Sequence, residues 1–281
     1  MRFENTQVMN FEGALRGMRN PMNSWAKSDS IFDLYCEHED SEAVFEVAEK
    51  WAEYLLKNRE FTTEEAYDKE FEKIREERNG WLWRQGASFI GMDHHYTLDL
   101  IGPNDMDLCR RLINGGSEHR KFLRQIMVSV DITAPLYWWK EFDTYKVGTT
   151  ANSTSTMHKL ASTPITRDCF EMDDFDAENL VIGEEYVNDI LYDYTCGEFL
   201  DSIIQHLEEL RVKYNETKNK RYWKELIRWL PNGWLQTRTV TMNYENLRSM
   251  YHQRENHKLT EWHSFCDWVK TLPYAEELII N

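Results

Sequence analysis

Residues 237–252 read TRTVTMNYENLRSMYH, and this stretch decides much of the fold because its periodicity changes halfway along. Thr and Val residues up to Val240 favour a strand over about 234–242, since β-branched side chains fit a pleated sheet. Beyond this strand, Leu247 and Met250 recur at helical spacing. The sequence therefore predicts a strand that leads directly into a helix.

Further helices are predicted on both sides of this strand and helix. Downstream, Trp262 and Val269 belong to another apolar helical face. Upstream, apolar residues repeat at helical spacing over 198–214, and a further helix is predicted over 218–230. The Pro-Asn-Gly sequence at 231–233 then stops the second of these helices, because proline and glycine both favour a helix end.

One more strand is predicted further upstream, where the apolar pattern changes to alternation between 122 and 135. One side of this strand would carry every second residue, namely Ile126, Val128, Val130 and Ile132. Two polar stretches fit loops instead: the Ser/Thr/Asn-rich residues 148–156 and the acidic residues 168–178.

The N-terminal part predicts a helical hairpin at about 41–78. Its first helix has apolar residues at helical spacing, and its second would begin where Thr62 and Glu65 have capping-box spacing. Asn79-Gly80 would end the second helix, since glycine favours helix ends. Helices and strands thus mix without the βαβ rhythm of a parallel sheet. We therefore expect an α+β fold in a single domain over 1–281.

Composition restricts the classes of function. The chain has 281 residues and a formal charge of −16, which disfavours long nucleic acid as a ligand because like charges repel. A small nucleotide in a locally basic pocket stays compatible with this charge. The five cysteines are scattered without CxxC spacing, which favours neither a disulfide framework nor a structural metal. No apolar run approaches the length of about 20 residues that a membrane span needs, so we expect no membrane partner. The scattered cysteines favour a reducing, cytoplasmic location.

The best-known catalytic and phosphate-binding motifs are missing from the sequence. It contains no GxGxxG turn, Walker loop, GxSxG elbow or HExxH helix. His94 and His95 beside Asp93 could suggest metal ligands, but adjacent residues of a strand point to opposite faces and no second ligand cluster is visible. We therefore predict no metal site, and no catalytic residue is assigned.

Two separated stretches of the sequence resemble the flavin-dependent thymidylate synthase family. In the first, the strand TRTVTMNY is followed by Asn246-Leu247-Arg248-Ser249-Met250-Tyr251-His252 and then by Glu261-Trp262, in the order of the family's strand, N-x-R-S-x-x-[NH] helix and tryptophan-bearing helix. In the second, Ser117-Glu118-His119 precedes a strand, and the later loop GTTANSTS at 148–155 is similar to the family's signature loop. The two stretches cover roughly half of the chain, mainly 115–160 and 231–275.

The resemblance implies an α+β fold with a twisted antiparallel or mixed sheet packed against long helices, in a homotetramer that shares its cofactor sites between subunits. It implies FAD and a small uridine-type nucleotide as ligands, with a reduced folate and NADPH as further candidates. The leading hypothesis is reductive one-carbon transfer by a thymidylate synthase-like methyltransferase. Two alternatives stay open: a non-catalytic binding or interaction module on the same fold, and a flavoenzyme acting on another nucleotide.

The resemblance also implies two groups of site residues. The cofactor group comprises Asn246, Arg248, His252 and His119. An amide can pair with the edge of an isoalloxazine ring, and a guanidinium can hold a phosphate through two parallel hydrogen bonds. The substrate group comprises Asn152, Ser153, Ser155 and His257. The alternative structural interpretation makes Asn246 a helix N-cap and Arg248 a solvated residue of the first turn.

The sequence departs from the family pattern at several positions. Glu141-Phe142-Asp143 stands where the family has Arg-His-Arg, Ser153 replaces the signature Glu, and Met157-His158 replaces Arg-Tyr. His257 lies near the position of a family arginine. Carboxylates in place of guanidinium groups reverse the sign of the interaction with a phosphate, so we expect weak binding of dUMP. The neighbouring Trp138-Trp139 is interpreted as core packing, the usual role of paired aromatic residues.

Overall fold

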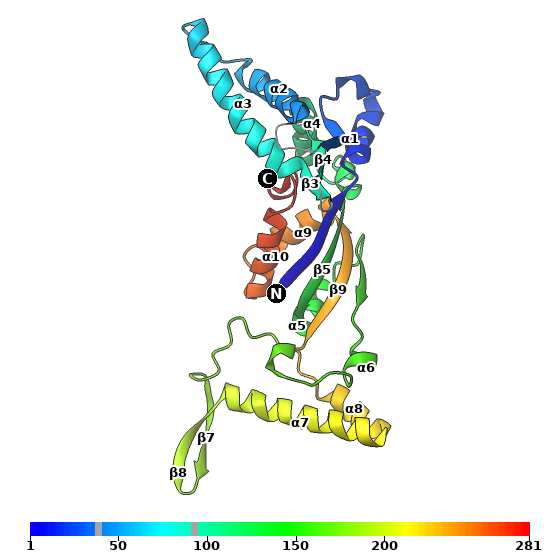
Figure 1. Ribbon diagram of the computed structural model, residues 1–281, viewed down its shortest axis with the longest axis vertical. Helices are drawn as coiled ribbons and strands as arrows, with labels where there is room; N and C mark the ends of the chain where they lie inside the picture. Colours follow the sequence, from blue (N-terminus) through cyan, green and yellow to red (C-terminus); the bar gives the residue numbers. More distant parts are fainter. Residues whose placement is uncertain (37–40, 91–94) are drawn as a thin grey trace. The chain divides into compact units, whose positions relative to one another are not determined.

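The computed structural model describes residues 1–36, 41–90 and 95–281 (Figure 1). These residues form two compact units. Unit 1 comprises Met1–Asn5, Val130–Lys146 and Thr150–Val240, and unit 2 comprises Thr6–Ser129, Val147–Thr149 and Thr241–Asn281. A single thymidylate synthase-like domain over the whole chain stays a prediction.

Helices mix with antiparallel strands along the chain, which confirms the predicted α+β class. The strands are β1 (Arg2–Met9), β2 (Ile31–Cys36), β3 (Ala87–Ile90), β4 (His95–Leu100), β5 (Met127–Pro135), β6 (Thr150–Ser153), β7 (Val181–Val187), β8 (Ile190–Thr195) and β9 (Leu235–Asn243). The longer helices are α1 (Phe11–Arg19), α2 (Glu42–Leu56), α3 (Glu64–Gly86), α4 (Pro103–Asn114), α5 (Leu136–Phe142), α7 (Cys196–Thr217), α8 (Lys220–Arg228), α9 (Tyr244–Arg254) and α10 (Thr260–Lys270). Shorter helical segments include η3 (Lys121–Arg124), α6 (Thr156–Lys159) and the π-helical η5 (Glu276–Ile280).

The two strands predicted from alternation and β-branched residues are neighbours in one sheet, whose strand order is β1-β5-β9-β6. In unit 1, the Thr239 hydroxyl of β9 donates to Asp131 of β5 at 2.6 Å, and the hydroxyls of Thr133 and Thr237 lie 2.7 Å apart. Such cross-strand pairs fix the register of a sheet. The structure adds two sheets that the sequence did not predict, with orders β2-β4-β3 and β7-β8.

The helices α2 and α3 pack against each other in unit 2 through Ala52, Leu56 and Ile74. The predicted start of the second helix was wrong by one residue, because it is Thr63 whose hydroxyl accepts a hydrogen bond from the Ala66 amide at 3.1 Å. This side chain satisfies one of the unpaired amides of the first helical turn.

The second helix also continues past the predicted stop at Asn79-Gly80 and ends at Gly86. The Trp81 ring packs edge-on against Trp51 and against Tyr274, with ring centroids 5.6 Å apart in both pairs. Burial of this last part of the helix outweighs the roughly 1 kcal/mol that a glycine costs inside a helix. Tertiary packing therefore overrides the local stop signal.

The residues considered for a metal site fall partly outside the described ranges. Asp93 and His94 are not described, whereas His95 begins β4 and its ring lies 4.9 Å from that of Tyr35. Among the residues that the structure describes, no group of three His, Cys, Asp or Glu side chains could hold a metal ion. Nor does any described helix have the length and apolarity to cross a membrane.

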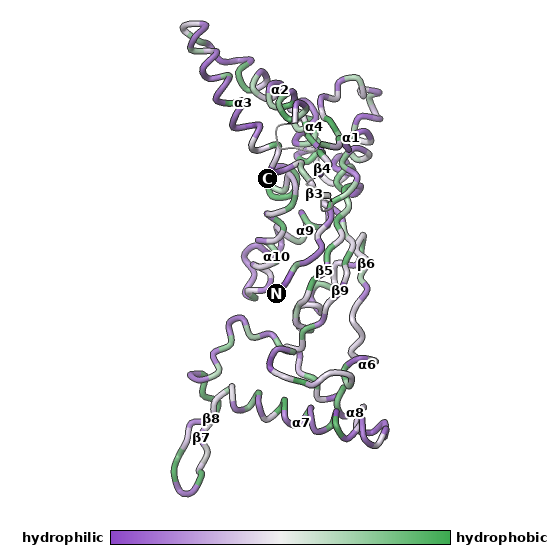
Figure 2. Tube along the Cα trace, in the orientation of Figure 1, coloured by the Kyte–Doolittle hydropathy of each residue, from purple (hydrophilic) through white to green (hydrophobic). Residues whose placement is uncertain are grey.

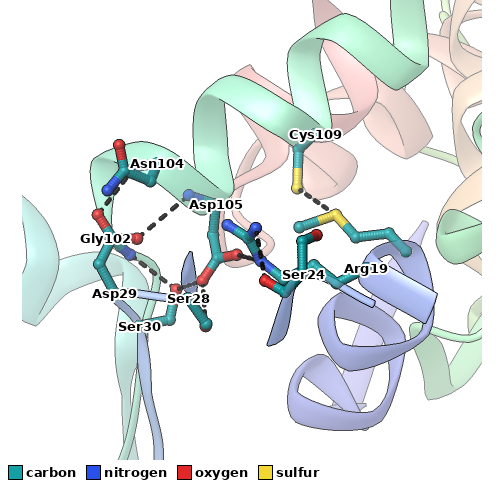
Figure 3. A network of polar contacts seen from close by, with 10 residues as sticks. Arg19, Ser24, Ser28, Asp29, Ser30, Gly102, Asn104, Asp105 and Cys109 are labelled. Carbon is teal, nitrogen blue, oxygen red and sulfur yellow. Dashed lines mark hydrogen bonds and ion pairs between the residues drawn. The ribbon is translucent and has the colours of Figure 1, made fainter. Parts of the chain in front are cut away.

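A buried ion pair joins α1 to α4 in unit 2 (Figure 3). Arg19 Nε donates to Asp105 Oδ1 at 2.6 Å, and the hydroxyls of Ser28 and Ser30 both donate to Asp105 Oδ2 at 2.6 Å. The side chains of Arg19 and Asp105 are 5% and 0% exposed. Asp29 caps the same helix by accepting hydrogen bonds from the amides of Asn104 and Asp105. Three segments of the chain thus meet at one carboxylate.

Unit 1 contains α7 and α8, which pack through a core that includes Leu207, Leu210 and Leu226. The helix predicted over 198–214 runs from Cys196 to Thr217, and a capping box between Thr195 and Glu198 sets its start. The hairpin of β7 and β8 comes directly before α7. Its strands were missed because acidic residues interrupt the alternation that marks a half-buried strand.

Candidate functional site

The start of α9 is held by a capping box that involves the first cofactor candidate. The N-cap is Asn243, whose side chain accepts a hydrogen bond from the Asn246 amide at 3.0 Å. In return, Asn246 Oδ1 accepts one from the Asn243 amide at 3.3 Å. The alternative interpretation of Asn246 as the N-cap was therefore wrong by three residues. The sequence misled because both positions carry asparagine, which is a favourable N-cap.

Asn246 also ties the beginning of the signature loop to α9 within unit 2. Its Nδ2 atom donates to the Val147 carbonyl at 2.7 Å. The next residue, Gly148, has φ of 79°, a left-handed conformation that favours glycine. A Cβ atom at this position would lie 2.8 Å from Asn246 Oδ1 and 3.0 Å from Asn243 Nδ2. The two motif regions therefore meet, although about a hundred residues separate them in sequence.

The second cofactor candidate, Arg248, is half-buried rather than solvated. Its Nη1 atom donates to the backbone carbonyls of Ile279 and Asn281 at 2.7 and 2.6 Å. Burial lowers the pKa of its guanidinium, and the nearby positive charge of Arg120 lowers it further, while Glu245 opposes these effects. This arrangement contradicts the alternative interpretation of Arg248 as a solvated first-turn residue.

Arg120 brings a second guanidinium to the same part of unit 2. Its Nε atom donates to both carboxylate oxygens of Glu245, at 3.0 and 2.8 Å. Two guanidinium groups with one carboxylate between them leave a local excess of positive charge. Arginine forks suit the oxygens of a phosphate, so this pair of guanidinium groups is chemically suited to an anion.

The third candidate on α9, His252, is exposed, and its ring lies edge-on to Tyr251. Burial of part of the ring lowers the pKa of His252, and the positive charge of Arg248 lowers it further. A lowered pKa favours the neutral imidazole, which can both donate and accept a hydrogen bond. Arg248 and His252 are therefore electrostatically coupled on one side of α9.

The two remaining histidine candidates lie elsewhere in unit 2. His119 is exposed and lines a cleft of about 450 Å³ together with residues that include Met18, Phe122 and Gln125. His257 lies between α9 and α10, where its Nδ1 accepts a hydrogen bond from the Leu259 amide at 3.2 Å. That hydrogen bond gives His257 a local structural role in the turn.

The other substrate candidates belong to unit 1. Asn152 and Ser153 are exposed on β6, and Ser155 is half-buried just after it. The predicted loop at 148–156 is therefore partly a strand, because it pairs beside β9. Gln236 of β9 donates to the Thr154 carbonyl at 2.9 Å, and the Thr154 amide donates to the Thr237 carbonyl at 2.9 Å. These hydrogen bonds, one from the Gln236 side chain and one between backbone groups, hold the Ser/Thr-rich segment extended beside β9.

An arginine that the sequence analysis missed lies beside the altered signature in unit 1. Arg238 Nη1 donates to Asp143 at 2.6 Å, and its guanidinium stacks over the Trp139 ring with 4.2 Å to the centroid. Asp143 is thus paired with a cation and does not act as a bare negative charge. The cation comes from β9, about a hundred residues away in sequence, and the expectation of weak dUMP binding stays a prediction. Trp138 and Trp139 are buried, which confirms their interpretation as core packing.

The residues that sequence reasoning missed have weak local signals. Arg120 directly follows His119, and Glu245 directly precedes Asn246, so each adjoins a chosen residue. Arg238 lies in the quoted strand itself, on the same face as the buried Val240 and Met242, because alternate residues of a strand share a face. Only the folded structure shows that Arg120 pairs with Glu245 and that Arg238 pairs with Asp143.

Comparisons with known proteins give likenesses of fold. No protein-family model matches the chain, and no curated protein matches it. A flavin-dependent thymidylate synthase ThyX from Helicobacter pylori, in complex with FAD and dUMP, superposes with a TM-score of 0.45 at 13% identity, over 89% of this chain and 97% of that one. A second structure of ThyX from the same organism, with the same ligands, gives 0.43 at 14% identity and the same coverage.

A third solved structure is the UMP/dUMP methylase PolB from Streptomyces cacaoi, bound with 5-Br UMP. It superposes with a TM-score of 0.44 at 14% identity, over 63% of this chain and 83% of that one. Identities and TM-scores at these levels assign no family, ligand or activity to this chain.

Proposed function

We propose that this protein binds FAD and a uridine-type nucleotide and catalyses reductive one-carbon transfer to that nucleotide. The observation that carries the proposal is the contact between the two motif regions, in which Asn246 of the N-x-R-S helix holds Val147 and Gly148 at the start of the signature loop. This contact brings the two motif regions together at the start of α9. We further propose a homotetramer, a reduced folate as one-carbon donor and NADPH as reductant.

Each part of this chemistry needs a particular side chain. Arg120 and Arg248 would hold the FAD diphosphate, and the exposed His252 would donate a hydrogen bond to the cofactor. Bound FAD would supply the reducing hydride. In unit 1, the exposed Asn152 and Ser153 would offer polar groups to a nucleotide, and Arg238 would offer a guanidinium near the altered signature.

A specific observation also favours the second candidate, a non-catalytic binding module. Asn246 uses its side-chain oxygen and its Nδ2 on the protein itself, and Arg248 uses Nη1 on two backbone carbonyls. Groups that are already engaged in this way stabilise the fold without any ligand. The two candidates differ in whether FAD binds.

The decisive experiment is the visible absorption spectrum of the purified protein, followed by titration with FAD. We expect binding in the native protein and a loss of at least about tenfold in affinity, or 1.4 kcal/mol, in Arg248→Met, because the variant removes a phosphate donor. The matched control is Arg111→Met, which removes the same charge from an exposed position on α4. No binding at high micromolar FAD would refute the proposed enzyme and favour the module.

Nucleotide binding tests the role of Asp143 in unit 1. We expect Asp143→Asn to tighten dUMP binding by about tenfold at low salt, because it frees Arg238 from its ion pair and removes a negative charge. The gain should shrink as salt rises, since exposed charges are screened. Calorimetry of Asp201→Asn is the control, because this exposed carboxylate in the same unit also pairs with an arginine, Arg167, at 2.6 Å. Equal dUMP affinities in both variants would exclude Arg238 from the phosphate site.

A further inference from the structure

Charge is strongly segregated along residues 168–230. The first part, 168–209, contains fourteen Asp and Glu residues and neither Lys nor Arg. The second part, 211–230, contains seven Lys and Arg residues against two Glu, a net charge of +5 in a chain whose total is −16. We call these parts the acidic segment and the basic segment.

The boundary between the two segments lies within α7 of unit 1, and the outer part of each segment adjoins one end of this helix. The β7-β8 hairpin precedes its first turn, and α8 follows its last turn (Figure 1). Twenty-two residues of helix span about 33 Å, whereas charges in physiological salt are screened beyond about 8 Å. The two ends of α7 therefore cannot neutralise each other within one copy of the chain.

The β7-β8 hairpin exposes large apolar side chains to solvent. Tyr186 and Ile190 are 73% and 56% exposed, and Figure 2 shows hydrophobic stretches along the hairpin. At its middle, Glu184 lies directly opposite Asp193 across the two strands. Like charges in this position destabilise a strand pair, and an isolated two-stranded hairpin is only marginally stable in water. A partner surface that carries cations would cover the exposed apolar side chains and offset the repulsion between Glu184 and Asp193.

The basic segment has the complementary properties. Lys213, Lys220, Arg221 and Lys224 are all exposed, and the large apolar side chain of Trp229 is 60% exposed beside them. The ion pairs described in this segment use other residues, since Arg211 pairs with Glu208 and Arg228 pairs with Glu225. The segment thus offers several cations and an indole ring to a partner.

We propose that the partner is a second copy of this chain, with the two α7 helices antiparallel. In this arrangement the acidic hairpin of each copy lies on the basic segment of the other, so one two-fold axis generates two identical contacts. A parallel arrangement would place acidic segment on acidic segment and is disfavoured by like charge. Charge complementarity therefore selects both the partner and its direction.

The test uses charge reversal followed by mixing. One variant reverses the hairpin by Glu184→Lys, Asp189→Lys and Asp193→Lys, and the other reverses the basic segment by Lys220→Glu, Arg221→Glu and Lys224→Glu. We expect each variant alone to have half the molar mass of the native assembly by light scattering at micromolar concentration. An equimolar mixture should regain the native mass with one copy of each variant per pair, because both contacts are complementary again.

The control is the triple variant Lys57→Glu, Lys69→Glu and Lys73→Glu at exposed positions, the first just after α2 and the other two on α3. It makes the same change in total charge as the basic-segment variant. It should keep the native mass. Circular dichroism of every variant checks that the helices remain folded. Any of three results would overturn the proposal. The native chain could be monomeric, the reversal variants could keep the native mass, or the mixture could stay dissociated. The readout is mass, so it is independent of FAD or nucleotide binding.

Discussion

Replacing Asp105 with alanine is expected to lower the free energy of unfolding by about 3–5 kcal/mol, because it strands the buried Arg19 charge without its partner. The hydroxyls of Ser28 and Ser30 lose the same acceptor, which adds the smaller loss of two part-buried hydrogen bonds. Urea unfolding followed by circular dichroism measures the effect.

Two comparisons isolate the buried ion pair. Asp107→Ala on the same helix removes an exposed carboxylate that pairs with Arg111, and we expect a loss of about 0–1 kcal/mol. Removing both buried charges together, as Arg19→Met with Asp105→Leu, should recover much of the stability lost in the single variant. If Asp105→Ala were as stable as Asp107→Ala, water would have to solvate Arg19, and the ion pair would not be a buried one.

Replacing Gly148 with alanine is expected to cost about 2–4 kcal/mol from two sources. The left-handed backbone disfavours any residue with a Cβ atom by about 1–2 kcal/mol, and the new methyl group would press on Asn246 and Asn243. Since those side chains form the capping box of α9, the variant should also weaken FAD binding if Arg248 and His252 hold the cofactor. Thermal unfolding and FAD titration of one preparation measure both effects.

Substitutions at two other glycines distinguish the cost of the left-handed backbone from the cost of the new side-chain contact. Gly116 has φ of 100° with open space around it, so Gly116→Ala should show the backbone cost alone. Gly233 has neither a left-handed φ nor a close neighbour, so Gly233→Ala should change stability by less than about 1 kcal/mol. If Gly148→Ala cost no more than Gly116→Ala, the contact with Asn246 would not constrain the loop.

The elements that the sequence predicted well are those with a long, regular apolar pattern. The helix with Leu207 and Leu210 and the strand with alternating Val128 and Val130 both have a buried side that repeats at one period. The stop at Gly80 was wrong because the later turns of α3 pack the half-buried Trp81 against Trp51 and Tyr274, which are distant in sequence. A local signal cannot contain that information.

The site residues chosen from the motifs stay predictions, and the sequence did not predict the contacts that these residues make. The motif order selected Asn246 and Arg248, yet their hydrogen bonds to Val147 and to the last residues of the chain depend on the tertiary fold. Arg238 was missed for a similar reason. Its partner Asp143 was interpreted from the sequence only as a replacement for a family arginine, without a cationic partner of its own. Charges in a sequence have no assigned partners until the strands are paired.

The carboxylate of Asp105 has one more consequence, which concerns the order in which unit 2 comes apart. Arg19 at the end of α1, the segment with Ser28 and Ser30, and the start of α4 all depend on it. None of these three segments can detach alone without leaving a charged or polar group unpartnered in the interior. They should therefore open together as one cooperative block rather than fray one after another from their ends.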